Sequence, residues 1–194
     1  MKLKTSEREV KELFIAWVLV SLAFAFAIDT GDRNLPESMV ISLSTIGPAF
    51  IFHELAHKIV AQKFGCWAEF RMSIQMLLFA VIFAFFSGMV FAAPGAVMIS
   101  GYGLTKSQNG KISVAGAATN LLMVVVFSFM ALFGSGLLVN IGLFGAFINA
   151  LIAGFNMIPF GPLDGKKVLA WNKTVYLTVV ALSVFAIIAT TGSV

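Results

Sequence analysis

Six apolar runs, separated by short polar stretches, are the feature that most constrains the fold of this chain. Hydrophobic residues make up 59% of its 194 positions and charged residues only 11%, whereas a soluble domain carries about 25% charged residues. A helix needs about 20 apolar residues to cross a bilayer, and most of the runs approach this length. The sequence therefore predicts an all-α polytopic membrane protein, a bundle of about five to six transmembrane helices. The runs cover residues 13–28, 39–64, 77–91, 112–133, 137–158 and 174–191.

Charge and cysteine content exclude several functional classes. The net charge of +4 comes from lysines beside the apolar runs. Because no basic stripe is interleaved with aromatic residues, we expect no nucleic-acid partner. The single cysteine, Cys66, excludes an internal disulfide and a multi-cysteine zinc site. We expect one membrane-embedded domain over residues 1–194, with no separate soluble domain.

The distribution of lysines predicts how the chain is oriented in the membrane. The loop 29–38 is poor in positive charge, whereas Lys58 and Lys63 lie at the end of the second apolar run and Lys166 and Lys167 follow the fifth. Cytoplasmic loops carry an excess of lysine and arginine. We therefore expect a multi-pass protein of the cell membrane, with a cytoplasmic N-terminus and loop 29–38 outside.

The stretch 73–103 can be interpreted in two ways. Residues 77–91 are apolar enough to cross, but Pro94 and Gly95 interrupt the stretch, and 96–104 resembles a short strand and turn. A complete crossing would place Lys106 and Lys111 outside, against the charge rule. We favour a segment that enters the membrane and returns, because non-helical backbone is tolerated at that depth only where it lines a cavity or is buried in protein.

Residues 53–57 read HELAH and lie inside the second apolar run. On a helix, positions i and i+4 share one face, so His53 and His57 can hold one metal ion, and Glu54 can reach a water on that metal as a general base. These are the only two histidines of the chain. Such a motif also arises by chance, but ionisable groups at membrane depth are costly and usually functional. We therefore favour a metal site over a structural polar patch.

A catalytic zinc site needs a third protein ligand and an open position for water. With both histidines used, we expect a carboxylate, and Asp164 follows a long apolar run amid backbone-breaking residues. By the charge rule it lies on the same side of the membrane as the HELAH motif. An aspartate before a glycine, here Gly165, is also a common turn residue. Spacing alone leaves the two interpretations equally open.

Two segments together resemble a known family. Residues 156–165, NMIPFGPLDG, are similar to the NxxPxxxLDG signature of site-2 proteases, the intramembrane zinc metallopeptidases, and residues 52–57, FHELAH, are similar to that family's first motif. The resemblance covers about 39–168 and implies that these residues form the catalytic core of the domain. It implies one Zn²⁺ held by His53, His57 and Asp164, with Glu54 as the base.

The same resemblance implies roles for further residues. The family pattern GPxxN is met by Gly116 and Asn120, with Ala117 in place of the proline. The family's asparagines at the positions of Asn120 and Asn156, the latter in the NxxPxxxLDG signature, imply that both residues help to hold the substrate; an interhelical hydrogen bond is the alternative for Asn120. Residues 96–104 resemble a short membrane-dipping β element beside the active site.

These features predict an enzyme that hydrolyses peptide bonds within the lipid bilayer. We expect its substrates to be single-span transmembrane proteins, unwound locally and paired as a strand with the edge of 96–104. A divalent-metal transporter is a weaker interpretation, because transporters usually show paired halves and none is visible here. An inactive scaffold that binds membrane helices is a third, against which the intact set of candidate ligands argues.

Overall fold

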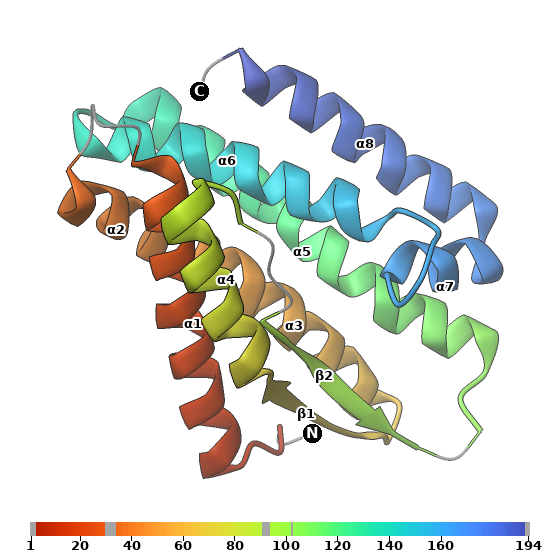
Figure 1. Ribbon diagram of the computed structural model, residues 1–194. Coiled ribbons are helices and arrows are strands. Elements are labelled where there is room, and N and C mark those ends of the chain that lie inside the picture. The colour runs from red at the N-terminus through yellow and green to blue at the C-terminus, as the bar shows by residue number, and fades with distance from the viewer. Residues whose placement is uncertain (1–2, 30–33, 91–93, 102, 193–194) are drawn as a thin grey trace.

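The computed structural model describes residues 3–29, 34–90, 94–101 and 103–192, and within them it is a helical bundle with one small sheet (Figure 1). Five stretches of the described chain are long and apolar enough to cross a membrane: α1, α2 together with α3, α5, α6 and α8. The predicted polytopic all-α fold is confirmed. In chain order the elements are α1 (Glu7–Ile28), α2 (Leu35–Ser44), α3 (Ile46–Lys63), β1 (Trp67–Met72), α4 (Ile74–Ser87), β2 (Gly95–Ser100), α5 (Lys106–Phe133), α6 (Leu137–Asn156), α7 (Asp164–Trp171) and α8 (Lys173–Thr191).

The second apolar run forms two helices, with the break between them at Thr45. The α2 helix ends at Ser44, and α3 begins at Ile46, so Pro48 lies in the first turn of α3. The backbone N–H groups of a first turn have no intrahelical partner, and proline is therefore tolerated there. The chain bends before Pro48, and α3 runs without interruption through the HELAH motif.

The two strands form an antiparallel pair that the sequence predicted only in part. The strand expected within 96–104 is β2, whereas β1 was missed. Met72 at the end of β1 pairs with Gly95 at the start of β2, and the Ser73 N–H donates to the Pro94 carbonyl at 3.0 Å. The chain between them therefore leaves the sheet and returns to the same end of it.

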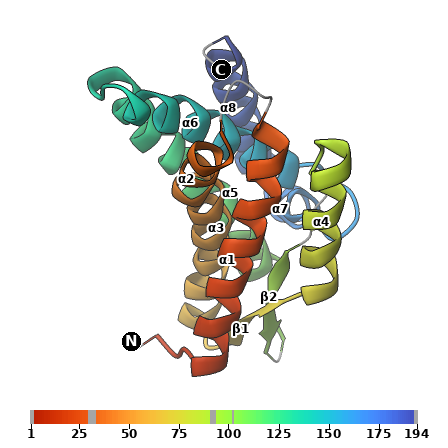
Figure 2. The ribbon, with the colours of Figure 1, turned by 60° about the vertical axis from the view of Figure 1, so that its left-hand side comes forward.

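The α4 helix fills this excursion and does not cross the bundle. Its 14 residues span about 21 Å at 1.5 Å per residue, short of the roughly 30 Å of a hydrocarbon core. It stands beside α1, above the strands (Figure 2), where Ala80 and Ala84 pack against Ala23. Residues 91–93 and 102 of the stretch 73–103 lie outside the described residues, and re-entry of this stretch stays a prediction.

The N-terminal part of α1 covers the outer edge of β1. The N–H of Phe70 donates to Glu9 at 2.9 Å, and the N–H of Met72 donates to Glu12 at 3.0 Å. In an antiparallel pair, alternate residues direct both backbone groups away from the partner strand. Phe70 pairs with Val97, so Val97 likewise directs its N–H outward, from the free edge of β2. Among the described residues, α1 caps the edge of β1, and no strand pairs with the opposite edge, that of β2.

A buried ion pair holds α3 against α1, one residue beyond the HELAH histidines. Lys58 is 2% exposed and Glu9 is 0% exposed. Lys58 Nζ donates to Glu9 Oε2 and to Thr5 Oγ1, the latter at 2.9 Å. Since Glu9 also accepts from Phe70, this carboxylate joins α1, α3 and β1 at one point.

We expect Lys58→Met to destabilise the protein by about 3–5 kcal/mol, because it leaves the Glu9 carboxylate buried without its cation. Denaturant unfolding in detergent micelles measures this loss. The double variant Glu9→Gln, Lys58→Met removes both charges and keeps an acceptor for Phe70, so it should recover part of the stability. A Lys58→Met protein as stable as the parent would contradict this role of the pair.

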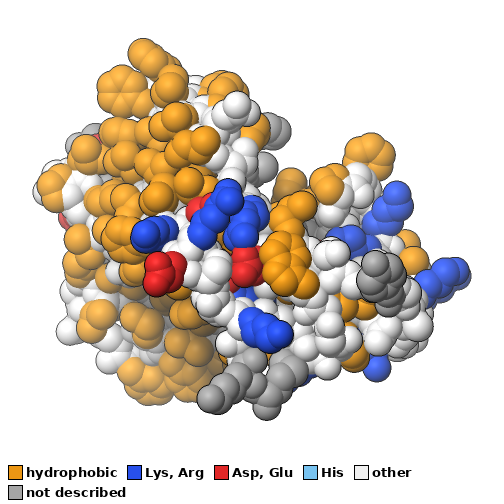
Figure 3. Space-filling model, turned by 90° about the horizontal axis from the view of Figure 1, so that it is seen from below, with side chains coloured by type: hydrophobic (Ala, Val, Ile, Leu, Met, Phe, Trp, Pro, Cys, Tyr) orange, Lys and Arg blue, Asp and Glu red, His pale blue; other side chains and the backbone are white. Residues whose placement is uncertain are grey.

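Charged side chains gather at one end of the bundle (Figure 3), with hydrophobic side chains over the flanks. The helices alternate in direction, and α4 does not cross, so the start of α1, the end of α3 and the starts of α5 and α8 lie at this end. The lysines that the sequence analysis assigned to one side of the membrane therefore lie together.

The α5 and α6 helices form the most extensive helix–helix contact of the fold. The α5 and α6 helices lie side by side, with the backbone of Gly142 close to Ala131 and that of Gly145 close to the Phe127 ring. A second apolar cluster joins α7 and α8 to this pair. Its buried members are Ala117, Ala153, Met157, Val168 and Val179.

Candidate metal centre

The α3 helix presents both histidines on one buried face. His53 and His57 lie one turn apart, their ring centroids are 4.6 Å from one another, and they are 3% and 8% exposed. His53 is ten residues before Lys63, the last residue of α3, and this separation corresponds to about 15 Å along the helix. His57 is six residues before Lys63, or about 9 Å, so both imidazoles lie inside the bundle and His53 lies deeper than His57.

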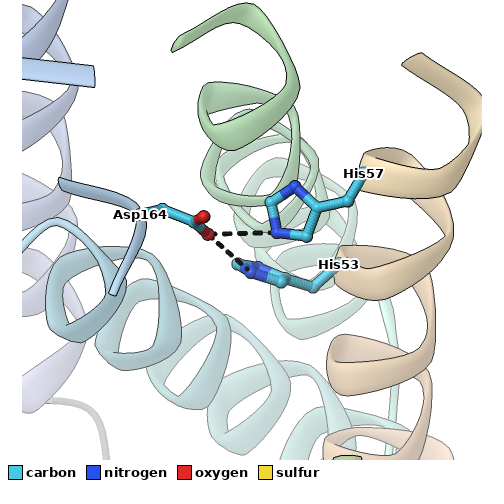
Figure 4. A group of neighbouring side chains, drawn as sticks. All are labelled: His53, His57 and Asp164. Atoms are coloured by element: carbon cyan, nitrogen blue, oxygen red, sulfur yellow. Dashed lines mark ion pairs between the residues drawn. The ribbon is translucent and has the colours of Figure 1, made fainter. Parts of the chain in front are cut away.

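The carboxylate of Asp164 reaches the histidines from the opposite side. Asp164 is the first residue of α7, which packs against the end of α6. A Cβ on Gly165 would lie 2.1 Å from the Met157 carbonyl oxygen, so only glycine allows this close approach. Figure 4 shows the Asp164 side chain pointing from α7 toward both rings. The short helix α7 was missed by the sequence analysis, which expected an irregular segment here.

The three side chains converge with their donor atoms facing one another. Asp164 Oδ2 lies 3.0 Å from His57 Nε2 and 3.4 Å from His53 Nε2. One potential ligand atom from each residue lies within 4.8 Å of the others, the one such group of three found in the described part of the chain. Ligand atoms about 2.0–2.1 Å from a tetrahedral zinc are about 3.4 Å apart. Two imidazoles and one carboxylate at this spacing fit a zinc ion.

The charge of Asp164 suits a metal ligand. Burial raises the pKa of its carboxyl, but the contacts with the His53 and His57 rings outweigh this effect and hold the pKa below its usual range. The carboxyl is therefore ionised at neutral pH. Lys167, in the next turn of α7, lies 3.7 Å from the other oxygen, Oδ1.

Each imidazole is oriented by a bond to its second nitrogen. His57 Nδ1 lies 2.8 Å from the backbone oxygen of Ile112, and His53 Nδ1 lies 2.6 Å from Asn120 Oδ1. A backbone carbonyl can only accept, so His57 Nδ1 carries the proton and Nε2 keeps its lone pair. Metal-binding histidines typically donate their other N–H to such an acceptor.

Gly116 makes room for both rings. A Cβ at this position would lie 2.5 Å from His53 Nε2 and 2.7 Å from His57 Cε1. The small size of Gly116 lets α5 approach the imidazoles, at the start of the segment 116–120 that ends at Asn120.

We expect Gly116→Ala to weaken zinc binding by on the order of tenfold or more, because its methyl group displaces both rings. Gly154→Ala is the matched control, since a Cβ there meets the flexible end of Ile187 at 3.1 Å and the Ser183 Cβ at an ordinary 3.6 Å. Competition with a chromophoric chelator measures both affinities. Equal affinities for Gly116→Ala and the parent would contradict the proposed crowding.

Glu54 lies beside the three converging side chains and contacts the sheet. It is 9% exposed, and its Oε2 accepts a hydrogen bond of 2.8 Å from the N–H of Val97. This N–H belongs to the free edge of β2. The bond fixes the carboxylate between the histidine helix and the strand.

The two predicted substrate-binding asparagines have different surroundings. Asn120 is 0% exposed, and its amide bonds to His53, Ala49 and Asn149. Asn156 is half-buried at the end of α6 and donates to the Ile152 carbonyl of its own helix at 3.0 Å. The alternative considered for Asn120, an interhelical hydrogen bond, is therefore present, and contact with substrate stays a prediction for both.

Two curated relatives, both named "putative zinc metalloprotease", resemble the chain. MJ0611 of Methanocaldococcus jannaschii is 43% identical over 176 residues, which cover 90% of each chain. The chain belongs to this metalloprotease family. Its identification as a member of the site-2 protease family is thus confirmed.

The second relative matches a smaller part of the chain. Rip3 of Mycobacterium tuberculosis is 27% identical over 126 residues, or 62% of this chain and 28% of Rip3. No protein-family model matches the chain, and no solved structure gives a significant match. Membership of the family therefore rests mainly on MJ0611.

The sequence analysis missed Asn149, a buried neighbour of the metal centre. It is 0% exposed on α6 and accepts a hydrogen bond from Asn120 at 2.9 Å. A signal was present, because an uncharged polar side chain within an apolar span usually bonds to another helix.

Proposed function

We propose that this chain is an intramembrane zinc metalloprotease that hydrolyses peptide bonds in or near the transmembrane segments of single-span membrane proteins. The observation that carries the proposal is the convergence of His53, His57 and Asp164 on one buried point, with Glu54 beside them. The family of MJ0611 supports the metalloprotease activity. The depth of the histidines in an apolar bundle supports cleavage below the membrane surface.

The residues have distinct roles in this proposal. His53, His57 and Asp164 hold the zinc. A zinc ion in such a site supplies Lewis-acid chemistry, since it lowers the pKa of water to about 7 and polarises a carbonyl. Glu54 accepts a proton from the attacking water and later donates it to the leaving amine. Its bond to the Val97 N–H holds the carboxylate in place for this transfer.

The free edge of β2 is the proposed binding site for the substrate. A transmembrane helix must unwind before a protease can reach its carbonyls, and its freed backbone groups then need partners in a dry environment. Addition as a strand to an existing edge supplies them. Glu9 and Glu12 cap the edge of β1. The edge of β2, by contrast, contacts Glu54 through the Val97 N–H. Asn156 is retained as a candidate contact to the bound strand.

The location follows from the same arrangement. The lysines at the end of α3 and in the first turn of α7 lie at the end of the bundle nearer the metal centre, and the positive-inside rule assigns such an end to the cytoplasm. We therefore propose a multi-pass protein of the cell membrane, with a cytoplasmic N-terminus and water reaching the site from the cytoplasm.

Cleavage by the purified protein in liposomes tests the function. The probes are tagged single-span proteins whose spans carry glycine and proline, which favour unwinding. We expect cleavage within the span, its loss on chelation by 1,10-phenanthroline and its return on addition of Zn²⁺. Cleavage that persists without metal, or that is confined to loops outside the membrane, would contradict the proposal.

A further inference from the structure

A chain of buried amides connects α6 to the metal centre. Asn149 Nδ2 donates to the Gly145 carbonyl at 2.8 Å, and Asn149 Oδ1 accepts from Asn120 Nδ2 at 2.9 Å. Asn120 Nδ2 also donates to the Ala49 carbonyl at 3.0 Å, and Asn120 Oδ1 lies 2.6 Å from His53 Nδ1. Both amides are 0% exposed.

The backbone carbonyls at the ends of this chain set its direction. A carbonyl can only accept, so Asn149 must direct its NH₂ group to Gly145 and its oxygen to Asn120. Asn120 then directs its NH₂ group to Asn149 and Ala49, which leaves its oxygen toward His53. An acceptor at this point requires that His53 Nδ1 carry the proton. The lone pair of Nε2 is thereby free to bind the metal.

Asn149 is one of two acceptors, with the Ala49 carbonyl, that keep the side-chain amide of Asn120 from turning around. With its amide turned around, Asn120 would present NH₂ to His53 Nδ1 and favour the tautomer that carries its proton on Nε2. That proton would point at the metal position. In the observed arrangement, reversal would also bring the Asn120 oxygen against two acceptor oxygens, those of Ala49 and Asn149. Without Asn149, only Ala49 opposes it.

We propose that Asn149 is a positioning residue for the metal centre, which acts through Asn120 to hold His53 in its zinc-binding tautomer and orientation. This inference rests on the proposed zinc site and assigns a role to α6, which contributes no ligand to the cluster. His57 does not depend on the relay, because its Nδ1 is held by the Ile112 carbonyl. The two histidines therefore respond differently to a change at Asn149.

Zinc affinity of the purified full-length chain provides the first test. Loss of a direct outer partner of a metal-binding histidine typically weakens metal binding 10–100-fold, so we expect this range for Asn120→Leu and about tenfold for Asn149→Leu. Asn149→Asp keeps an acceptor for Asn120 in either protonation state and should bind within about twofold of the parent. Ser183→Ala removes a buried hydrogen bond on α8, far along the chain from these amides, and is the control for general loss of packing.

Histidine-selective ¹⁵N labelling provides a readout that loss of packing alone would not reproduce. The chain has two histidines, so the zinc-loaded protein gives two imidazole signals. We expect Asn149→Leu to shift the Nδ1–H signal of His53 and to leave that of His57 in place, and Asn149→Asp to restore the parent spectrum.

The outcomes separate this inference from the proposed function. A parent protein that binds no zinc would contradict the proposed function itself. A parent that binds zinc, with an Asn149→Leu variant of equal affinity or with both imidazole signals shifted alike, would overturn the relay alone. If Asn149→Leu does not fold, Asn149→Ser carries the same expectations, because its shorter side chain withdraws the oxygen from Asn120.

Discussion

Glu54→Gln is expected to abolish peptide hydrolysis while the protein keeps one zinc per chain. General acid–base catalysis typically contributes 10²–10⁴-fold to a rate, so the cleavage rate should fall by at least about 10²-fold. The amide of glutamine cannot accept the proton of the attacking water. It can still accept the hydrogen bond from the Val97 N–H, so the contact between α3 and β2 is kept.

Two controls separate a loss of catalysis from a loss of structure or of zinc. Glu54→Leu removes both the base and the acceptor for Val97, so comparison with Glu54→Gln separates catalysis from the structural contact. Zinc content, measured on the same preparations, shows whether the metal site survives. Proteolysis at the parental rate in Glu54→Gln would exclude Glu54 as the base.

Asp164→Ala should eliminate stoichiometric zinc and activity together. The substitution removes one of three ligands, and it leaves two imidazoles that already approach each other on one helix. The pKa of Asp164 lies below its usual range, so the parent carboxylate is charged and available as a ligand at neutral pH. The exposed Glu7→Ala, which also removes one carboxylate, is the matched control and should keep one zinc per chain.

Metal analysis after gel filtration checks this expectation. Zinc at one equivalent in the Asp164→Ala protein would show that other groups complete the site. It would favour the interpretation of Asp164 as a turn residue before Gly165, which spacing alone had left open.

The membrane helices were predictable because each is driven by a local property, a long apolar run. The ligand pair His53 and His57 was predictable for a similar reason, since i and i+4 positions share one helix face whatever the rest of the chain does. Asp164 needed the resemblance to a family, because about 107 residues separate it from His57 and no local pattern predicts such a contact.

The elements that were missed depend on distant partners. The β1 strand has its edge capped by Glu9 and Glu12 of α1, about 60 residues earlier, and its own sequence, WAEFRM, carries two charges. The α7 helix is short and follows proline and glycine, so it was expected to be irregular. Its burial of Val168 against α5 and α6 explains why it forms.

The role of Gly116 was hidden for the same physical reason. A glycine in an apolar helix indicates close approach, but the sequence does not say to what. Packing against α6 was the natural expectation, whereas the structure places the two imidazoles there. Asn149 was overlooked because its partner, Asn120, lies on another helix.

The most direct test of the account is zinc K-edge X-ray absorption on the metal-loaded, full-length chain. We predict a coordination shell of light atoms only, at about 2.0–2.1 Å, with the multiple-scattering pattern of two imidazoles. The Asp164→Ala protein should lack this spectrum. A sulfur scatterer at about 2.3 Å, which only Cys66 or a methionine could supply, or a shell with fewer than two imidazoles, would contradict the site built from His53, His57 and Asp164.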